Sequence, residues 1–319
     1  MQQISLRRVT VIEALGQQTL AVVLVLCIVL GPAGTALYFV LRRKKLALRE
    51  RRSPLSTDLL RTPGHTLRQR LDEGRTDLLA EMMVLVLAPA LLLGFLYVIG
   101  LVTGRAHGIW LHGLMAMVVL GFAAFQTRKL LRLAKQLEQW TLGLDGEMAA
   151  GQELDQLMRQ GAAVFHDLAA DKFNVDHVVI SRQGVFAVET KGYRKPIRNG
   201  GLDDAKVSYD GKVLAFPDWT DSRPLAQAES QARWLADWLS QATGERVEVM
   251  PVLALPGWFV DRKGRGPVLV LNGVELRSHL LKARGAKPLT EEQVRRIAHQ
   301  VEQRCRDVKP FYGKVDQGK

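Results

Sequence analysis

The sequence predicts an α/β protein in which N-terminal transmembrane helices precede a domain with a mixed β-sheet flanked by helices. Three observations lead to this fold class. Long uncharged apolar stretches lie within the first 125 residues. The later sequence alternates short β-branched runs with amphipathic helical patterns. Within it, the segment 174–191, NVDHVVISRQGVFAVETK, contains two apolar runs with charged side chains at their outer ends.

Three stretches are candidate membrane spans. Residues 19–41 and 82–103 are uncharged and long enough to cross a bilayer as helices, and residues 109–125 are at the low end of the spanning range. A cleaved signal peptide is the alternative for the first stretch, but its apolar region is too long and RRKK follows it directly. We therefore expect a membrane domain over residues 1–125.

Charge placement predicts the orientation of these spans. The loop 42–81 is rich in arginine and lysine, and four basic residues follow the third span: Arg128, Lys129, Arg132 and Lys135. Since positive loops stay in the cytoplasm, we expect both later spans to cross, with the amino terminus outside and residues 126–319 in the cytosol. This interpretation describes a multi-pass protein of a bacterial-type inner (cytoplasmic) membrane. Whether residues 109–125 cross fully or are partly re-entrant stays open.

Composition excludes several other classes. The formal net charge of +12 does not indicate nucleic-acid binding by itself, because much of the excess lies in the 42–81 loop, where topology and anionic lipid headgroups explain it. The two cysteines, Cys27 and Cys305, exclude a disulfide framework and a cysteine-based zinc site. The sequence has no phosphate-binding loop and no nucleophile elbow.

The remaining elements follow from periodicity and turn signals. A helix over residues 126–142 connects the membrane domain to a cytosolic domain over residues 143–319. In that domain we expect helices over 145–160, 224–243, 274–283 and 290–306, strands over 163–168, 247–255 and 268–271, and hairpins over 174–191 and 206–216. Thr290 and Gln293 form a capping box for the last helix. Helices on both faces of one mixed sheet are the expected arrangement.

The charged triplet Glu189-Thr190-Lys191 is the candidate site. An acidic residue also stands two positions before a lysine at three other places: Asp210, which occupies a tight hairpin turn, Asp261, in a basic glycine-containing loop, and Asp307, at a helix end. Only Glu189 follows an apolar strand and has a second carboxylate, Asp176, on a neighbouring strand. The layout is typical of a metal-dependent phosphodiesterase site. A salt bridge at a strand end is the alternative interpretation.

Side-chain parity adds to this hypothesis. Glu189 and Lys191 share one face of the strand with Val185 and Ala187, and the opposite face is also apolar. A strand covered on both faces is central, and charges there need one another or a cation. The neighbouring His177 points to the other face and is interpreted as structural or surface-lying. Two tryptophans spaced four apart, Trp234 and Trp238, are interpreted as core or domain-contact residues.

Four motifs in order, DGEMAAGQEL, VFHDL, FNVDHVVISRQGVFAVETKGYRKP and PLAQAESQARWL, closely resemble the nuclease-related domain, or NERD. That family is assigned to the PD-(D/E)XK restriction-endonuclease-like superfamily. The resemblance covers residues 143–255 and implies a restriction-endonuclease-like fold. It matches Glu147 to the family's helix glutamate, Asp176 to its strand aspartate, Glu189 and Lys191 to its E-x-K, and Gln227 to the glutamine that opens the following helix.

These residue types suit hydrolysis of a phosphodiester bond. Oxygen ligands from Asp176, Glu189, the Thr190 carbonyl and Glu147 are those that Mg²⁺ or Mn²⁺ prefers, and Lys191 would orient the attacking water. We therefore expect a membrane-anchored nuclease whose partners are nucleic acid, DNA being favoured over RNA, and the lipid bilayer. A non-catalytic membrane-tethered module that binds nucleic acid or protein on the same fold is the alternative.

Overall fold

The structure is a computed structural model of the 319-residue chain. It describes residues 34–36, 38–43, 55, 57–103, 108–197, 202–282 and 287–310. The chain divides into two compact units: Thr76–Ala134 belongs to the first, and Thr57–Arg75 together with Lys135–Pro310 forms the second. Each unit is considered by itself below.

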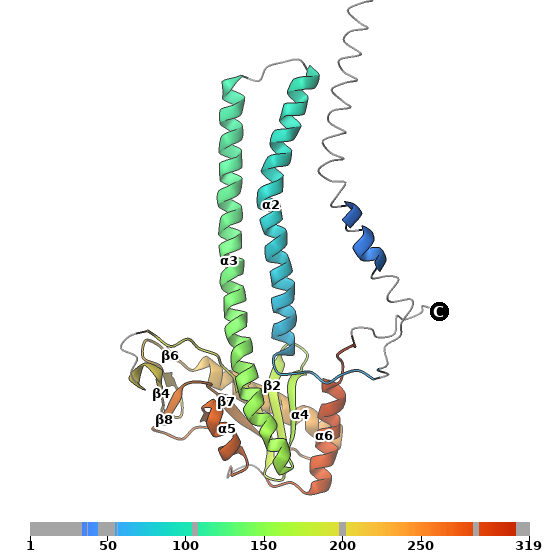
Figure 1. The fold of residues 1–319 in the computed structure, drawn as a ribbon. Helices are drawn as coiled ribbons and strands as arrows, with labels where there is room; N and C mark the ends of the chain where they lie inside the picture. Colours follow the sequence, from blue (N-terminus) through green and yellow to red (C-terminus); the bar gives the residue numbers. More distant parts are fainter. Residues whose placement is uncertain are drawn as a thin grey trace, which may run out of the picture. The chain divides into compact units, whose positions relative to one another are not determined.

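The first unit contains two long helices, parts of α2 (His65–Thr103) and α3 (Ile109–Asp155), which lie side by side and antiparallel (Figure 1). Glu81 of α2 accepts hydrogen bonds from Gln126 Nε2 at 3.0 Å and Lys129 Nζ at 2.6 Å, both on α3. By length and composition the two helices are long and apolar enough to cross a membrane. Of the predicted span 19–41, residues 34–36 and 38–41 are helical, and the rest lies outside the described residues.

Both long helices extend further than the sequence predicts. In the predicted loop 42–81, the residues from His65 onward are helical. The connecting helix and the helix predicted over 145–160 are one continuous helix, α3, which ends at Asp155 and is followed by a 3₁₀ turn, η1 (Gln156–Gln160). The glycines at 143 and 146 favour a break by propensity alone, but the helix continues through both, with the Leu67 side chain packed against Gly143 and the Gly192 backbone against Gly146.

A five-stranded mixed sheet forms the core of the second unit. Its strands, in spatial order, are β1 (Ala163–Ala169), β2 (Asn174–Ser181), β3 (Gly184–Thr190), β7 (Val249–Ala254) and β9 (Leu269–Leu271). β1, β2 and β3 pair antiparallel, whereas β7 is parallel to both β3 and β9. The predicted hairpin and the predicted mixed sheet are confirmed. Every residue of β3 is buried, as expected for a central strand.

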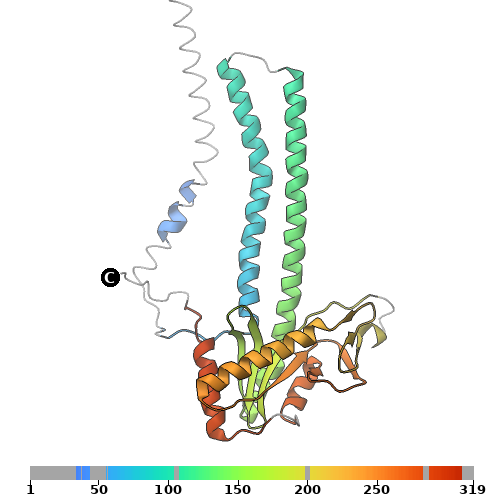
Figure 2. The ribbon, with the colours of Figure 1, turned by 180° about the vertical axis from the view of Figure 1, so that it is seen from behind.

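Helices cover both faces of this sheet (Figure 2). Helices α4 (Arg223–Thr243) and α6 (Glu291–Cys305) pack Leu235, Leu239 and Val301 against one face, which carries Val185 and Ala187. The end of α3, together with α5 (Gly273–Leu280), covers the other face through Leu154 and Leu276, among others. The predicted capping box of Thr290 and Gln293 at the start of α6 is present. The layered α/β arrangement therefore agrees with the predicted fold class.

The second unit also contains a four-stranded sheet, in which β4 (Lys206–Tyr209) and β5 (Leu214–Ala215) form the hairpin predicted over residues 206–216, while the pairing with the other two strands was not predicted. Its order is β6 (Thr220–Asp221), β5, β4 and β8 (Phe259–Arg262), and a short 3₁₀ helix, η2 (Leu202–Ala205), precedes β4. The prediction that Asp261 lies in a loop is wrong, because it lies in β8 and pairs with Lys206 of β4 at 3.0 Å. The strand is four residues long and pairs with a strand distant in sequence, so local periodicity carries little signal.

Two buried histidines on neighbouring strands of the main sheet are in contact. His166 on β1 and His177 on β2 are cross-strand neighbours whose Nδ1 atoms lie 2.9 Å apart, and His166 Nε2 lies 2.9 Å from Asp155 Oδ1. If His166 donates to the carboxylate, its Nδ1 accepts from His177, which leaves His177 Nε2 buried without a partner. Burial, and then the neighbouring His166, hold the pKa of His177 well below its usual range. His177 is therefore structural, on the face opposite Glu189.

We expect His177 to make the stability of the second unit depend on pH. The unfolded histidine takes up a proton near pH 6.5, whereas the buried one does not, so stability falls as the pH drops below that value, by about 1.4 kcal/mol per pH unit. The variant His177→Gln should be less stable at pH 7.5 but should lose this dependence. Thermal unfolding of both proteins between pH 7.5 and 5 measures the difference, and a gap that stays constant with pH would contradict the prediction.

Candidate active site

The candidate site lies at one end of the main sheet, where β2 begins and β3 ends. Because these strands are antiparallel and pair His177 with Val188, Asp176 and Glu189 come to the same end of the sheet. The backbone N–H of Thr190 donates to Asp176 Oδ2 at 2.7 Å, which ties the two strands together at this point. The sequence hypothesis that these carboxylates share one sheet end is therefore confirmed by the pairing register.

Glu189 is 1% exposed and has a protein partner on each oxygen. Its Oε1 lies 2.6 Å from Lys191 Nζ, and its Oε2 accepts a hydrogen bond from Gln231 Nε2 at 2.6 Å. Gln231, on α4, also donates to the carbonyl of Asn174 at 3.1 Å. The carboxylate is thus held between the lysine two residues later and the helix that covers this face.

Glu147 reaches the same end of the sheet from α3. A Cβ on the preceding residue, Gly146, would lie 3.1 Å from Gly192 Cα, and a Cβ on Gly192 would lie 2.4 Å from the carbonyl oxygen of Leu142. The helix and the chain leaving β3 therefore approach backbone to backbone, which side chains at these two positions would prevent. This close packing buries Glu147 and brings it under the electrostatic influence of Glu189 and Lys191.

Burial and mutual repulsion dominate the electrostatics of this cluster. Burial raises the pKa of Asp176 well above its usual range, and the carboxylates of Glu189 and Glu147 raise it further. Burial, with the carboxylates of Asp167 and Glu189, raises the pKa of Glu147 to about 8. For Lys191, burial lowers the pKa, but the adjacent Glu189 outweighs it, so that the lysine is held as an ammonium group. Clusters of strongly perturbed groups are typical of functional sites.

The structure separates one predicted site residue from the others. Gln227 is exposed near the start of α4, whereas Gln231, one turn further on, is buried and bonds Glu189. The sequence contained a signal for this, because Gln231 falls on the apolar stripe of the helix between Ala228 and Leu235. A polar residue on such a stripe needs a buried partner.

Basic side chains near the site, which could otherwise contact phosphates, are paired with acidic residues of the protein. Arg194, just beyond the triplet, pairs with Glu138 at 2.5 Å, and Arg262 pairs with Glu275, while Arg198 lies outside the described residues. Trp234 and Trp238 stack on each other with Arg304 over both rings and pack against the main core. Their contacts agree with the interpretation of the tryptophans as core residues.

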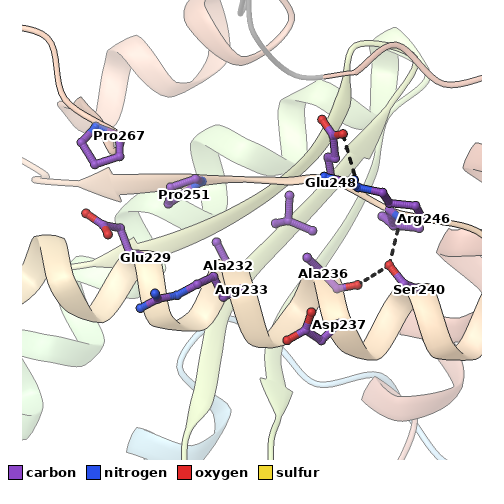
Figure 3. A pocket seen from close by; sticks show the side chains of 12 residues that line it. Glu229, Ala232, Arg233, Ala236, Asp237, Ser240, Arg246, Glu248, Pro251 and Pro267 are labelled. Atoms are coloured by element: carbon purple, nitrogen blue, oxygen red, sulfur yellow. Dashed lines mark hydrogen bonds and ion pairs between the residues drawn. The ribbon is translucent and has the colours of Figure 1, made fainter.

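An open groove of about 710 Å³ runs between α4 and the start of β7 (Figure 3). Its walls carry charges of both signs, including Glu229 and Arg233 from α4 and Arg246 and Glu248 before β7. β9 pairs with β7 only from Val252 onward, so the groove follows an unpaired strand edge, and Pro251 offers no N–H there. Prolines and charged side chains commonly prevent an exposed strand edge from pairing with another chain. The groove shares no lining residue with the carboxylate cluster.

The fold and the site together define an α/β domain with three carboxylates and a lysine at one end of a mixed sheet. Residues 142–256 match the family model of the nuclease-related domain, NERD. The match supports the NERD family and a nuclease-related fold for this segment, in agreement with the motifs in the sequence. A search of curated proteins found no match, and neither did a search of solved structures.

The donor chemistry of the cluster fits a divalent cation. Its oxygens are hard ligands. The raised pKa values of Asp176 and Glu147 reflect burial first and then the neighbouring carboxylates, whose charge a cation would offset. In the part of the chain that the structure describes, no three His, Cys, Asp or Glu side chains form a ready ligand set. Glu189 instead directs its oxygens to Lys191 and Gln231.

We expect Glu147→Gln to stabilise the protein at neutral pH in the presence of a chelator. The folded carboxyl has a raised pKa, so the folded state binds a proton that the unfolded state releases, and stability is lost as pH rises from about 4.5 to about 8. The variant removes this loss and should be more stable at pH 8 by about 1 to 3 kcal/mol, with little difference at pH 4. Thermal unfolding across this range is the measurement, and equal stability at pH 8 would contradict the assigned environment of Glu147.

Proposed function

We propose that the second unit is a divalent-metal-dependent nuclease that hydrolyses phosphodiester bonds in nucleic acid, DNA in preference to RNA, and that the apolar helices anchor it to a membrane. The observation that carries the proposal is the buried Glu189–Lys191 pair, 2.6 Å apart, beside Asp176 and Glu147 at one sheet end. The match of residues 142–256 to a nuclease-related family supports the same conclusion.

Asp176, Glu189 and Glu147, with the Thr190 carbonyl, would hold Mg²⁺ or Mn²⁺. Bound there, the cation supplies Lewis-acid polarisation of the scissile phosphate. Lys191 is the group that acts on the reacting oxygens: it is positively charged and partly exposed, so its ammonium donates hydrogen bonds to an attacking water and stabilises charge that develops on the phosphate. Gln231 fixes the orientation of Glu189 and is a positioning residue.

Two observations support anchoring in a membrane. The most apolar stretch of α2 is unburied in the structure, and that of α3 is nearly so. The polar bonds of Glu81 with Gln126 and Lys129 join the two helices where both apolar stretches meet polar sequence. Residues 109–125 would span about 25 Å as a helix, close to the thickness of a bilayer's hydrocarbon core. The proposed location is therefore a bacterial-type inner membrane, with the nuclease in the cytoplasm.

A second candidate function follows from the contacts of Glu189. Both of its oxygens are bonded to protein groups, as they would be in a purely structural ion pair. A membrane-tethered module that binds nucleic acid or protein without cleaving it would have this arrangement. Measurements of DNA cleavage and DNA binding by the full-length protein distinguish such a binding module from a nuclease.

We expect the full-length protein in detergent to cleave DNA when Mg²⁺ or Mn²⁺ is present and to stop when the metal is chelated. Lys191→Ala and Glu189→Gln should each lower the cleavage rate by about a hundredfold or more, because the first removes positive charge at the reacting phosphate and the second removes a proposed ligand of the cation. The matched control is Lys206→Ala, which breaks another lysine–carboxylate pair, with Asp261, in the second sheet. The control should cleave at the wild-type rate.

Two results would decide against the nuclease. Cleavage that persists in both site variants would show that the activity arises elsewhere. A wild-type protein that binds DNA with or without metal but never cuts it would instead establish the non-catalytic module.

For the membrane topology, we expect reporters at two positions to give opposite results. Alkaline phosphatase inserted after Gly108, between the two apolar helices, should be active, since the turn is expected outside. The same reporter fused after Lys319 should be inactive, whereas a green fluorescent reporter there should fluoresce. Phosphatase activity at Lys319 would reject the proposed cytoplasmic location of the nuclease.

A further inference from the structure

The chain that leads into α2 lies against the carboxylate cluster of the second unit. We call residues 62–66 the lead-in segment; it lies outside the stretch 142–256 that matches the nuclease-related domain. Gly64 lies beside the carboxylate of Glu147, since a Cβ on Gly64 would be 3.7 Å from Glu147 Oε2. The backbone N–H of Gly64 opposes the rise in the pKa of this carboxyl group. Glu147 is thus contacted by a segment about eighty positions earlier in the chain.

We propose that the lead-in segment is part of the catalytic site: it positions Glu147, and Asp167 in turn holds the segment in place. The inference rests on the proposed function and adds two positioning residues to it, Gly64 and Asp167. Neither is expected to touch the substrate. Both act through the Glu147 carboxylate.

Asp167 is the anchor of the segment. Its side chain is almost fully buried, and Oδ2 accepts from the backbone N–H of Thr66 at 2.8 Å and from the Thr66 hydroxyl at 2.6 Å. Oδ1 accepts from Asn174 Nδ2 at 2.8 Å, and Arg61 Nη1 lies 3.5 Å from Oδ2. Because Thr66 is in the first turn of α2, a carboxylate from β1 serves as the cap of this helix.

The backbone at Asp167 is adapted to this contact. Its φ is +52°, and no other non-glycine residue in the described ranges has a positive φ. The strand register would place Asp167 opposite Asp176, but the ladder pairs only the residues on either side, His166 and Leu168. Asp167 therefore turns away from the other carboxylate and toward the lead-in segment. A backbone conformation of this kind persists where its surroundings hold it in place.

Steric fit leaves the segment little room to move. A Cβ on Gly64, whose φ is +66°, would lie 2.3 Å from Leu144 Cδ1 and 3.7 Å from Glu147 Oε2. One residue earlier, Pro63 packs on α3 so closely that a Cβ on Gly151 would lie 2.5 Å from its ring. The segment is therefore seated on α3 on both sides of Glu147. Displacing it would open the space beside the Glu147 carboxylate that Gly64 now fills.

The test compares two glycine variants of the full-length protein in detergent. Gly64→Ala strains a positive φ and also clashes beside Glu147, whereas Gly244→Ala strains a nearly equal φ of +71° with nothing within 4 Å. We expect Gly64→Ala to lower the affinity for Mn²⁺, measured by calorimetry without substrate, by about tenfold or more. It should lower kcat similarly, with little change in KM. Gly244→Ala should leave all three values unchanged at a similar loss of thermal stability.

Two further variants keep the test decisive if Gly64→Ala folds poorly. Thr66→Val removes only the hydroxyl bonds to Asp167 and Asn174 and should weaken Mn²⁺ binding in the same direction. Adding Leu144→Ala to Gly64→Ala relieves the clash and should restore part of the affinity. The inference is overturned if Gly64→Ala and Thr66→Val both bind Mn²⁺ and cleave as the wild type does.

The wild-type protein tests the proposed nuclease function independently of the variants. A wild-type protein that binds Mn²⁺ but cleaves no nucleic acid overturns the nuclease, while the Mn²⁺ affinities of the variants still decide the role of the lead-in segment. A wild type that neither binds Mn²⁺ nor cleaves overturns both.

Discussion

The concentration of negative charge at one end of the main sheet is the constraint on which the second unit depends. Burial of carboxylates is tolerated only where donors or cations compensate them, since an unpaired buried charge costs several kcal/mol. Here each compensating group comes from a different element: Lys191 from the end of β3, Gln231 from α4, the Thr190 amide from the sheet and the Gly64 amide from the lead-in segment. The charges are therefore tolerated only when sheet, helix and segment are assembled together.

Close backbone approach is what brings these groups together. Gly143, Gly146 and Gly151 lie within nine residues of α3, and each faces a neighbour that a side chain would meet at or near contact. Glycine inside a helix costs about 1 kcal/mol relative to alanine, so three of them weaken the helix locally. That cost is offset by the packing of α3 against Gly192 and Pro63, which buries Glu147 at the sheet end. The glycines lower the local stability of α3 but allow the close packing that places Glu147 in the site.

Features that depend on local sequence patterns were predicted correctly, whereas features that depend on pairing between distant segments were missed. The central hairpin, the parity that separates His177 from Glu189, and helices α4 and α6 follow from local periodicity, and the structure has them. β8 and the role of Asp167 do not. The pairing of β8 depends on a register with a strand far away in sequence, and the role of Asp167 depends on its contact with the first turn of α2. The assignment of Gln227 followed motif position, whereas the contact to Glu189 is made by Gln231, which the apolar stripe of α4 turns inward.

The energetics of the cluster favour a functional over a structural origin. A buried ion pair is about as stabilising as apolar residues of similar size, so Glu189 and Lys191 alone would be compatible with a simple strand-end salt bridge. A strand-end salt bridge does not explain Asp176 and Glu147. Burial and mutual repulsion raise the pKa values of both groups, so ionising either one destabilises the folded state. If all three carboxyl groups ionised, the single ammonium of Lys191 would not neutralise them. A domain that keeps such a cluster at a partly exposed sheet end loses stability there. The divalent cation that we propose for this site would offset the negative charge of the carboxylates.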